Sequence, residues 1–228
     1  MLIDVEKRAV SRHKTSTTST RRRRGPPALA IYVAVKAPMF SFSRLVCADP
    51  MVDVEMASTG EIGCFGDDLH EALLHALLAT GFKVPRKGVL LSLGPLTDKY
   101  WFADQARVLS QEMGLKLYAT HGTAEALTTV GIECTELAKH PEDGAMTGMD
   151  AFDQGLVDLV INIPIEYDEL GRPDGYHIRR RAVDAGIPLI TDLQRAQAII
   201  EALRHQKVKD LATLSWDECA ARRPVALK

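Results

Sequence analysis

From Gly88 onward, short apolar runs alternate with segments of helical pattern, and this alternation restricts the fold more than any other feature of the chain. Continuous apolar runs of this kind are typical of strands buried on both faces of a parallel sheet. We expect strands at 89–93, 115–119, 132–137, 156–163 and 188–191, and helices at 98–113, 123–130, 178–185 and 193–205. Strands joined by helices form right-handed crossovers. The sequence therefore predicts a three-layer α/β/α domain whose parallel sheet has about five strands.

The part of the chain before Gly88 is organised differently. Residues 28–42 read as an extended segment interrupted by Pro38, and residues 45–60 read as a loop. Residues 67–80 have leucines at helical spacing, with aspartates at the start and Gly81 after the end, which predicts a helix.

The N-terminal stretch has a strong charge bias. Residues 1–25 contain eight basic and two acidic side chains, so this stretch carries about +6 and the rest of the chain about −8. The absence of apolar periodicity predicts a disordered basic tail over residues 1–31. Nucleic-acid binding and organelle targeting are two functional interpretations of such a tail, but a solvated extension is the preferred one, so nucleic acid is not an expected partner.

Composition excludes several classes of protein. The charged and apolar fractions, 25% and 46%, are ordinary for a globular protein. No apolar run approaches the ~20 residues that span a bilayer, so we expect a soluble protein without a membrane partner. The four cysteines form no Cys-x-x-Cys pair, which favours reduced thiols and argues against zinc or another metal. A cytoplasmic location is expected, with mitochondria as the alternative.

The run Leu117–Ala124 passes from an apolar strand into hydroxyl, imidazole and glycine where a helix should begin. A strand followed by a small polar turn and a helix leaves free backbone N–H groups at the helix N-terminus, where an anion can bind. The hydroxyls of Thr120 and Thr123 could add donors. In the alternative interpretation, Thr120 only caps the helix.

Ligands of parallel α/β sheets bind at the carboxyl ends of the strands. The residues that follow the expected strands bring lysines, hydroxyls and an amide to this edge, which suits a small anion with hydrogen-bonding groups. The candidate ligand-binding residues are Ser92, Lys99, Thr120, His121, Gly122, Thr123, Lys139, Asn162 and Thr191.

Two long motifs give the chain a resemblance to a known family. Residues 32–41, YVAVKAPMFS, followed by residues 55–61, EMASTGE, resemble the closing segment of the second ATP-grasp unit of the carbamoyl phosphate synthetase large subunit. Residues 88–207 resemble the C-terminal regulatory domain of that subunit, which has the methylglyoxal-synthase-like fold. The resemblance divides the chain into a tail over 1–31, an ATP-grasp remnant with a connecting helix over 32–87, the regulatory domain over 88–207 and a C-terminal tail over 208–228.

The resemblance implies an effector-binding domain that does not catalyse a reaction alone. In the branch of the family regulated by nucleotides, positions that match Thr120, Thr123, Lys99 and Lys139 hold the effector phosphate, and Asn162 matches a nearby asparagine. In the branch activated by N-acetylglutamate, the position of Lys139 is usually tryptophan. Lys139 therefore favours a UMP- or IMP-type nucleotide. N-acetylglutamate stays open as the effector, because Pro164 and the ATP-grasp remnant resemble that branch.

The resemblance also implies which partners and cofactors to expect. The chain has only the end of an ATP-grasp unit, so ATP and Mg²⁺ or Mn²⁺ are expected only in the intact ligase, whose product serves pyrimidine and arginine biosynthesis. Expected partners are the rest of the synthetase and its glutaminase subunit, and a homo-oligomer is an open alternative.

A methylglyoxal-synthase-like lyase that acts on a triose phosphate is the alternative function. Asp150 is the only candidate for the general base of that reaction, but the glycines that flank the base in the family are missing. His121 lacks a carboxylate nearby in the sequence that could orient it. No catalytic residue is therefore assigned.

The run Arg179–Arg181 has two interpretations. It either contacts the rest of the enzyme or the effector pocket, or it is a solvated basic turn of a helix.

Overall fold

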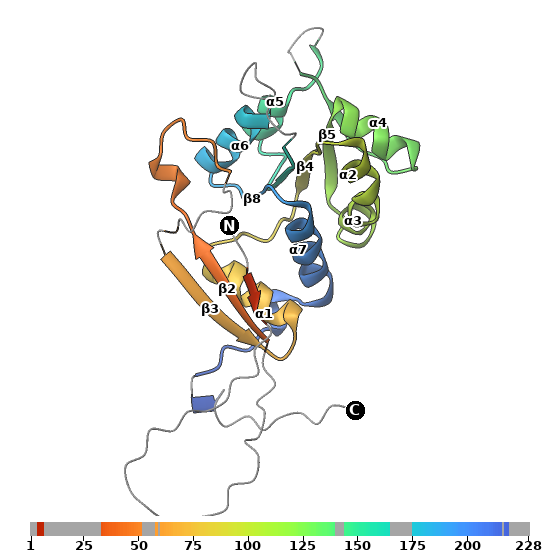
Figure 1. Ribbon diagram of the computed structural model, residues 1–228. Coiled ribbons are helices and arrows are strands. Elements are labelled where there is room, and N and C mark those ends of the chain that lie inside the picture. Colours follow the sequence, from red (N-terminus) through yellow and green to blue (C-terminus); the bar gives the residue numbers. More distant parts are fainter. Residues whose placement is uncertain are drawn as a thin grey trace, which may run out of the picture.

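The computed structural model describes residues 4–6, 33–51, 58, 60–139, 144–164, 175–215 and 217–218. Within these residues the strands form two sheets (Figure 1). One is a three-stranded sheet in the order β1-β2-β3, and the other is a five-stranded sheet in the order β6-β5-β4-β7-β8. Every neighbouring pair in the larger sheet is parallel, which confirms the expected parallel sheet of about five strands.

The larger sheet has short central strands that are apolar and largely buried, whereas one of its edge strands is mostly exposed. Its strands are β4 (Gly88–Ser92), β5 (Lys116–Thr120), β6 (Thr135–Leu137), β7 (Leu159–Asn162) and β8 (Leu189–Ile190). Alternate side chains of β4 enter two different core clusters: Val89 and Leu91 pack on one face, and Leu90 packs on the other.

Helices cover both faces of this sheet. The cluster on one face includes side chains from α3 (Ala103–Arg107), a π-helical turn (Val108–Glu112), α4 (His121–Thr129) and α7 (Leu193–His205), and α2 (Leu96–Trp101) precedes α3 without a buried side chain of its own. The cluster on the other face includes side chains from α5 (Gly148–Asp153) and α6 (Gly175–Asp184). The three-layer α/β/α prediction is therefore confirmed.

The single helix expected over residues 98–113 is wrong in detail. The structure divides this region into α2, α3 and the π-helical turn, in which the N–H of Met113 donates to the carbonyl of Val108. Phe102 lies at the break between α2 and α3, and its side chain is fully buried in the core. The hydroxyl of Ser110 donates to the carbonyl of Ala106, a type of bond that bends helices. Packing and local hydrogen bonds thus override the regular pattern.

The elements that were not predicted include a strand over residues 60–66 and a short helix over residues 148–153. Strand β3 (Gly60–Gly66) begins where a loop was expected, and its backbone pairs with β2 over the full length. The strand was missed because its glycines hide the alternating pattern of a strand. Helix α5 was missed because it is short and begins with Gly148.

The smaller sheet lies beside helix α1 (Leu69–Ala79), which packs against β2 (Val33–Met39), β3 and α7 (Figure 1). Helix α1 confirms the helix expected over residues 67–80, and the side chain of Asp68 caps it by accepting from the N–H of Glu71. Strand β1 (Asp4–Glu6) pairs antiparallel with β2. The prediction of a disordered tail is therefore wrong for these three residues. They form a strand because the edge of β2 offers unpaired N–H and C=O groups with which they can pair. The remainder of residues 1–31 lies outside the described residues.

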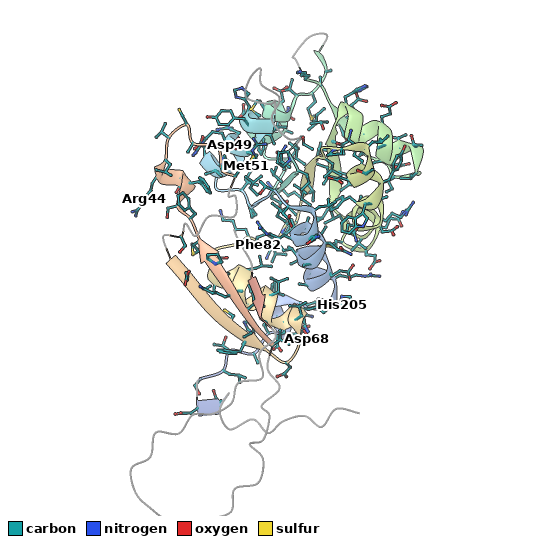
Figure 2. All side chains as sticks on the ribbon, viewed as in Figure 1. Arg44, Asp49, Met51, Asp68, Phe82 and His205 are labelled. Carbon is teal, nitrogen blue, oxygen red and sulfur yellow. The ribbon has the colours of Figure 1, made fainter. Side chains whose placement is uncertain are left out.

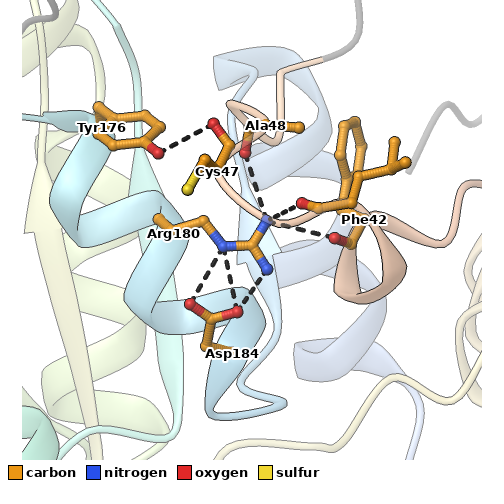
Figure 3. A network of polar contacts seen from close by, with 7 residues as sticks. Phe42, Cys47, Ala48, Tyr176, Arg180 and Asp184 are labelled. Atoms are coloured by element: carbon orange, nitrogen blue, oxygen red, sulfur yellow. Dashed lines mark hydrogen bonds and ion pairs between the residues drawn. The ribbon is translucent and has the colours of Figure 1, made fainter.

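A network of polar contacts joins residues 42–49, the N-terminal segment, to helix α6 (Figure 3). One guanidinium nitrogen of Arg180 donates to the carbonyls of Phe42, Leu45 and Ala48, at 3.2, 2.9 and 3.3 Å. Asp184 accepts from the other two nitrogens of the same guanidinium, and the hydroxyl of Tyr176 donates to the carbonyl of Cys47 at 3.0 Å. Segment 42–49 is thus fastened to the α/β domain by side chains of a single helix.

Candidate anion-binding site

Three predicted residues end adjacent strands at the same level. Ser92 of β4 is in register with Asn162 of β7. Leu91 is in register with Ala119, which puts Thr120 of β5 level with Ser92 on the other side. Neighbouring strands lie ~4.8 Å apart, so the three backbones span roughly 10 Å at the carboxyl edge of the sheet. This row of two hydroxyls and one amide forms the base of the candidate site.

The first turn of α4 carries a second group of predicted residues. A Cβ atom on Gly122 would lie 3.0 Å from the Nζ atom of Lys99, so the ammonium group sits directly over this turn. Thr120 occupies the N-cap position of α4, but its side chain makes no capping hydrogen bond. The interpretation of Thr120 as only a helix cap is therefore not supported. A helix N-terminus and a lysine ammonium both favour negative charge at this point.

His121 has a carboxylate partner that the sequence did not reveal. Its Nδ1 atom lies 2.7 Å from Oε1 of Glu136 on β6, although both side chains are largely exposed. The hydrogen bond to Glu136, followed by the charge of Glu136, raises the pKa of His121 above its usual value. Glu136 lies 15 residues from His121 along the chain, so a carboxylate orients His121 although none is close to it in the sequence. The pairing arises because β6 runs parallel to β5, with Glu136 opposite Ala119.

Thr123 lies beneath the edge instead of on it. It is 1% exposed, and its hydroxyl oxygen accepts the N–H of Leu93 at 3.0 Å. This contact joins the start of α4 to the residue that follows β4. Thr123 therefore supports the site from inside the domain.

Lys139 and Thr191 lie toward opposite margins of the sheet. Lys139 follows β6 and is exposed, whereas Thr191 follows β8. Strands β6 and β8 are the two edges of the sheet, so they lie roughly 19 Å apart. Thr191 also lines a separate cavity of about 350 Å³, together with Phe42, Phe82 and Arg195. A single small anion cannot contact both margins, so Lys139 and Thr191 do not belong to one compact pocket.

Arg179 is a residue of this region whose role the sequence did not settle. Its side chain is fully buried, and its Nη1 atom donates to Oδ1 of Asn162 at 2.7 Å. The solvated-turn interpretation of Arg179–Arg181 is therefore wrong for Arg179. The signal was present in the sequence, because position 179 lies on the buried stripe of α6 with Tyr176 and Ala182.

Asp150 takes part in a helix cap. Its carboxylate accepts from the backbone N–H of Thr147 at 2.9 Å and from the Thr147 hydroxyl at 2.6 Å, and the same hydroxyl accepts from the N–H of Asp150. This is the capping box of α5. The bonds from Thr147 lower the pKa of Asp150, which makes the carboxylate a weaker proton acceptor.

Comparison with known proteins identifies the class to which this fold belongs. The MGS-like domain family matches residues 103–191, so the chain contains an MGS-like domain. Over most of its length the chain is also related to the C-terminal region of carbamoyl-phosphate synthases and of multifunctional pyrimidine proteins.

Three relatives illustrate the similarity. Human mitochondrial carbamoyl-phosphate synthase [ammonia] is 41% identical over 81% of the chain, and the match covers 12% of that protein. The multifunctional protein pyr-3 of Neurospora crassa is 44% identical over 86% of the chain, and the multifunctional protein URA2 of Saccharomyces cerevisiae is 42% identical over 79%. The matches cover 11% and 8% of these two proteins. The chain thus spans about a tenth of the length of these relatives.

Two features are absent from the described residues. Among them, no helix has the length and apolar character needed to cross a bilayer. The same residues contain no group of three or more histidine, cysteine, aspartate or glutamate side chains that could hold a metal ion.

Proposed function

We propose that this chain is an effector-binding regulatory part of a carbamoyl phosphate synthetase and that it binds a small phosphorylated metabolite, of the UMP or IMP type, without catalysing a reaction alone. The observation that supports this function best is the Lys99 ammonium over Gly122 at the start of α4, beside the row of Ser92, Thr120 and Asn162. A positive group, a helix N-terminus and several hydrogen-bond donors together suit a phosphate.

Electrostatics support an anion over a cation. The raised pKa of His121 keeps more of its imidazole protonated near neutral pH, which adds a second positive group beside Lys99. A ligand oxygen at the first turn of α4 would also meet the backbone N–H groups of the helix N-terminus.

The proposal is tested by isothermal titration of the purified chain with UMP, IMP and N-acetylglutamate. We expect a nucleotide to bind, and Lys99→Ala to weaken that binding about tenfold or more through the loss of a charged contact. Lys207→Ala, at an exposed lysine beyond α7, is the matched control and should bind as the unchanged chain does. Absence of binding by either nucleotide would contradict the proposal.

The same titration addresses the choice of effector. Lys139→Trp introduces the residue that is usual in the N-acetylglutamate branch of the family. If Lys139 contributes to nucleotide preference, this variant should bind nucleotide more weakly. Tighter binding of N-acetylglutamate than of UMP and IMP by the unchanged chain would favour that branch instead.

A lyase activity is tested with dihydroxyacetone phosphate and an assay for released phosphate. We expect no turnover, because the Asp150 carboxylate is engaged in the capping box of α5 and its pKa is lowered. Phosphate release that Asp150→Asn abolishes would contradict the proposed regulatory role.

The wider setting is part of the same proposal. The expected partners are the rest of the synthetase and its glutaminase subunit, and the effector would act by binding two conformations of the synthetase with different affinity. The location in the cell stays a prediction: cytoplasmic, or mitochondrial as in the name of the human relative.

A further inference from the structure

A buried guanidinium connects the candidate site to the N-terminal segment. Arg179 is fully buried, and its Nε and Nη2 atoms donate to the two carboxylate oxygens of Asp49 at 2.7 and 2.5 Å. Its remaining nitrogen, Nη1, donates to Oδ1 of Asn162 at 2.7 Å. Asp49 lies beside α6 in Figure 2, although 130 residues separate it from Arg179. One side chain therefore contacts both segment 42–49 and the end of β7.

The contact with Arg179 determines how the Asn162 amide is oriented. A guanidinium can only donate, so it selects the carbonyl oxygen of the amide and leaves the two N–H donors for other partners. Gly175 packs closely against this pair: a Cβ atom on Gly175 would lie 2.8 Å from Nη1 of Arg179, 3.0 Å from Oδ1 of Asn162 and 3.1 Å from Nδ2 of Asn162. A flipped amide would point N–H groups at the guanidinium. Asn162 is 1% exposed, so its N–H groups can donate only to a ligand atom that reaches below the surface of the carboxyl edge.

We propose that Arg179 is a positioning residue of the ligand site. Asp49 holds Arg179, and Arg179 holds the Asn162 amide so that its N–H groups can donate to a ligand oxygen. The affinity of the site therefore depends on the docking of segment 42–49. This inference rests on the proposed function, because it needs a ligand at the strand edge. The ligand must present an acceptor, such as a phosphate or carboxylate oxygen, at Asn162. Because linkage is reciprocal, a bound ligand also strengthens the docking of segment 42–49.

The first test measures UMP affinity by isothermal titration in the Asp49→Asn variant. This change keeps the size of the side chain but removes the charge that holds Arg179, and we expect UMP to bind about tenfold more weakly. Asp153→Asn is the matched control, because it removes a carboxylate that pairs with Arg181 of the same helix and leaves both Arg179 and segment 42–49 untouched. This control should keep the affinity of the unchanged chain.

A double-mutant cycle separates positioning from general loosening of the fold. If Asp49 acts through the Asn162 amide, Asp49→Asn should weaken UMP binding in the unchanged chain but not in the Asn162→Ser background. An equal loss in both backgrounds would overturn the proposed route through Asn162. An unchanged affinity for UMP in the Asp49→Asn variant would overturn the proposal as a whole.

The Asn162→Asp variant tests the amide orientation even if Asp49→Asn fails to fold. The new carboxylate still accepts from Arg179, so the chain should fold, but it presents an anionic oxygen to the ligand. We expect UMP affinity to fall about 100-fold, and retained affinity would contradict the donor role of Asn162.

The same experiments distinguish this inference from the proposed function. If UMP, IMP and N-acetylglutamate all fail to bind the unchanged chain, the proposed function fails and the role of Arg179 fails with it. If a ligand binds and the Asp49 and Asn162 variants bind it equally well, only the role of Arg179 is wrong.

Discussion

The protonation of the His121 imidazole depends on Glu136, a residue 15 positions away in the sequence. Its pair with Glu136 is exposed, so it contributes little to stability, but it changes the protonation of the imidazole. The stabilising effect of the pair is complete below the pKa of a free histidine. It is lost as pH rises through the raised pKa of the folded state.

The Glu136→Gln variant should lower the pKa of His121 toward the usual value of 6.5. Removing the carboxylate removes both the charge–charge attraction and the bond that favours the imidazolium. Titration of the His121 ring protons by NMR measures this shift, with the other imidazole signals as an internal reference. An unchanged His121 titration would show that the pair does not form in solution.

For the unchanged chain, UMP binding should weaken as pH rises through the His121 pKa, because the imidazolium loses its charge.

Thr123 has a structural role that any ligand experiment must take into account. Thr123→Val keeps the shape of the side chain but leaves the buried N–H of Leu93 without its acceptor. We expect a loss of about 2 kcal/mol in the free energy of unfolding and a Tm lower by roughly 4–8 °C. Urea unfolding of the chain without ligand measures this effect. An unchanged stability, together with weaker ligand binding, would instead indicate that the hydroxyl contacts the ligand.

At the scale of elements, short helices depend on their caps. Helix α5 has six residues, so little of its stability comes from internal hydrogen bonds. The Thr147–Asp150 capping box and the burial of Ala151 and Phe152 hold it on the sheet. This explains why a segment with no clear helical pattern forms a helix.

Removal of the cap by Thr147→Ala should cost about 1 kcal/mol and lower the Tm by roughly 2–4 °C. The physical reason is that the N–H of Asp150 loses its acceptor and the Asp150 carboxylate loses the hydroxyl donor. Thermal unfolding followed by circular dichroism measures the change. Thr129→Ala, at an exposed position near the end of α4, provides a comparison and should have a smaller effect. Equal effects of the two changes would argue against the capping box.

At the scale of the whole molecule, α6 ties the N-terminal segment to the α/β domain. Arg179 and Arg180 are adjacent in the sequence, yet both bind segment 42–49: one through a carboxylate and the other through three carbonyls. Polar groups of an irregular segment need such partners where they are removed from water. The two units are therefore joined by specific bonds in addition to apolar packing.

The Arg180→Gln variant should release segment 42–48 while the α/β domain stays folded. Loss of the donor to three carbonyls should raise amide hydrogen exchange in this segment about tenfold, as measured by mass spectrometry. Arg181→Gln is the matched control, because Arg181 pairs with Asp153 of α5 and does not contact segment 42–48 in the described bonds. The same exchange rate in both variants would contradict the role of Arg180.

Much of the α/β fold was predictable because its signals are local. The strand at residues 89–93 and the helix at residues 193–205 follow from apolar runs and helical spacing, and the structure reproduces them within one residue. The break at Phe102 was not predictable in this way, because the core selects it. Strand β3 was missed for the related reason that backbone pairing, and not side-chain pattern, forms it.

The sequence by itself determined the alternation of strands and helices, and through it the edge of the sheet where the candidate residues gather. Only the tertiary structure decided which of these side chains meet, since strand register and helix packing bring together residues that no spacing rule connects. Glu136 reaches His121 across two parallel strands, and Asp49 reaches Arg179 across 130 residues. The physical reason is that periodicity records burial along one element, whereas a contact between elements depends on the shape of the whole packed core.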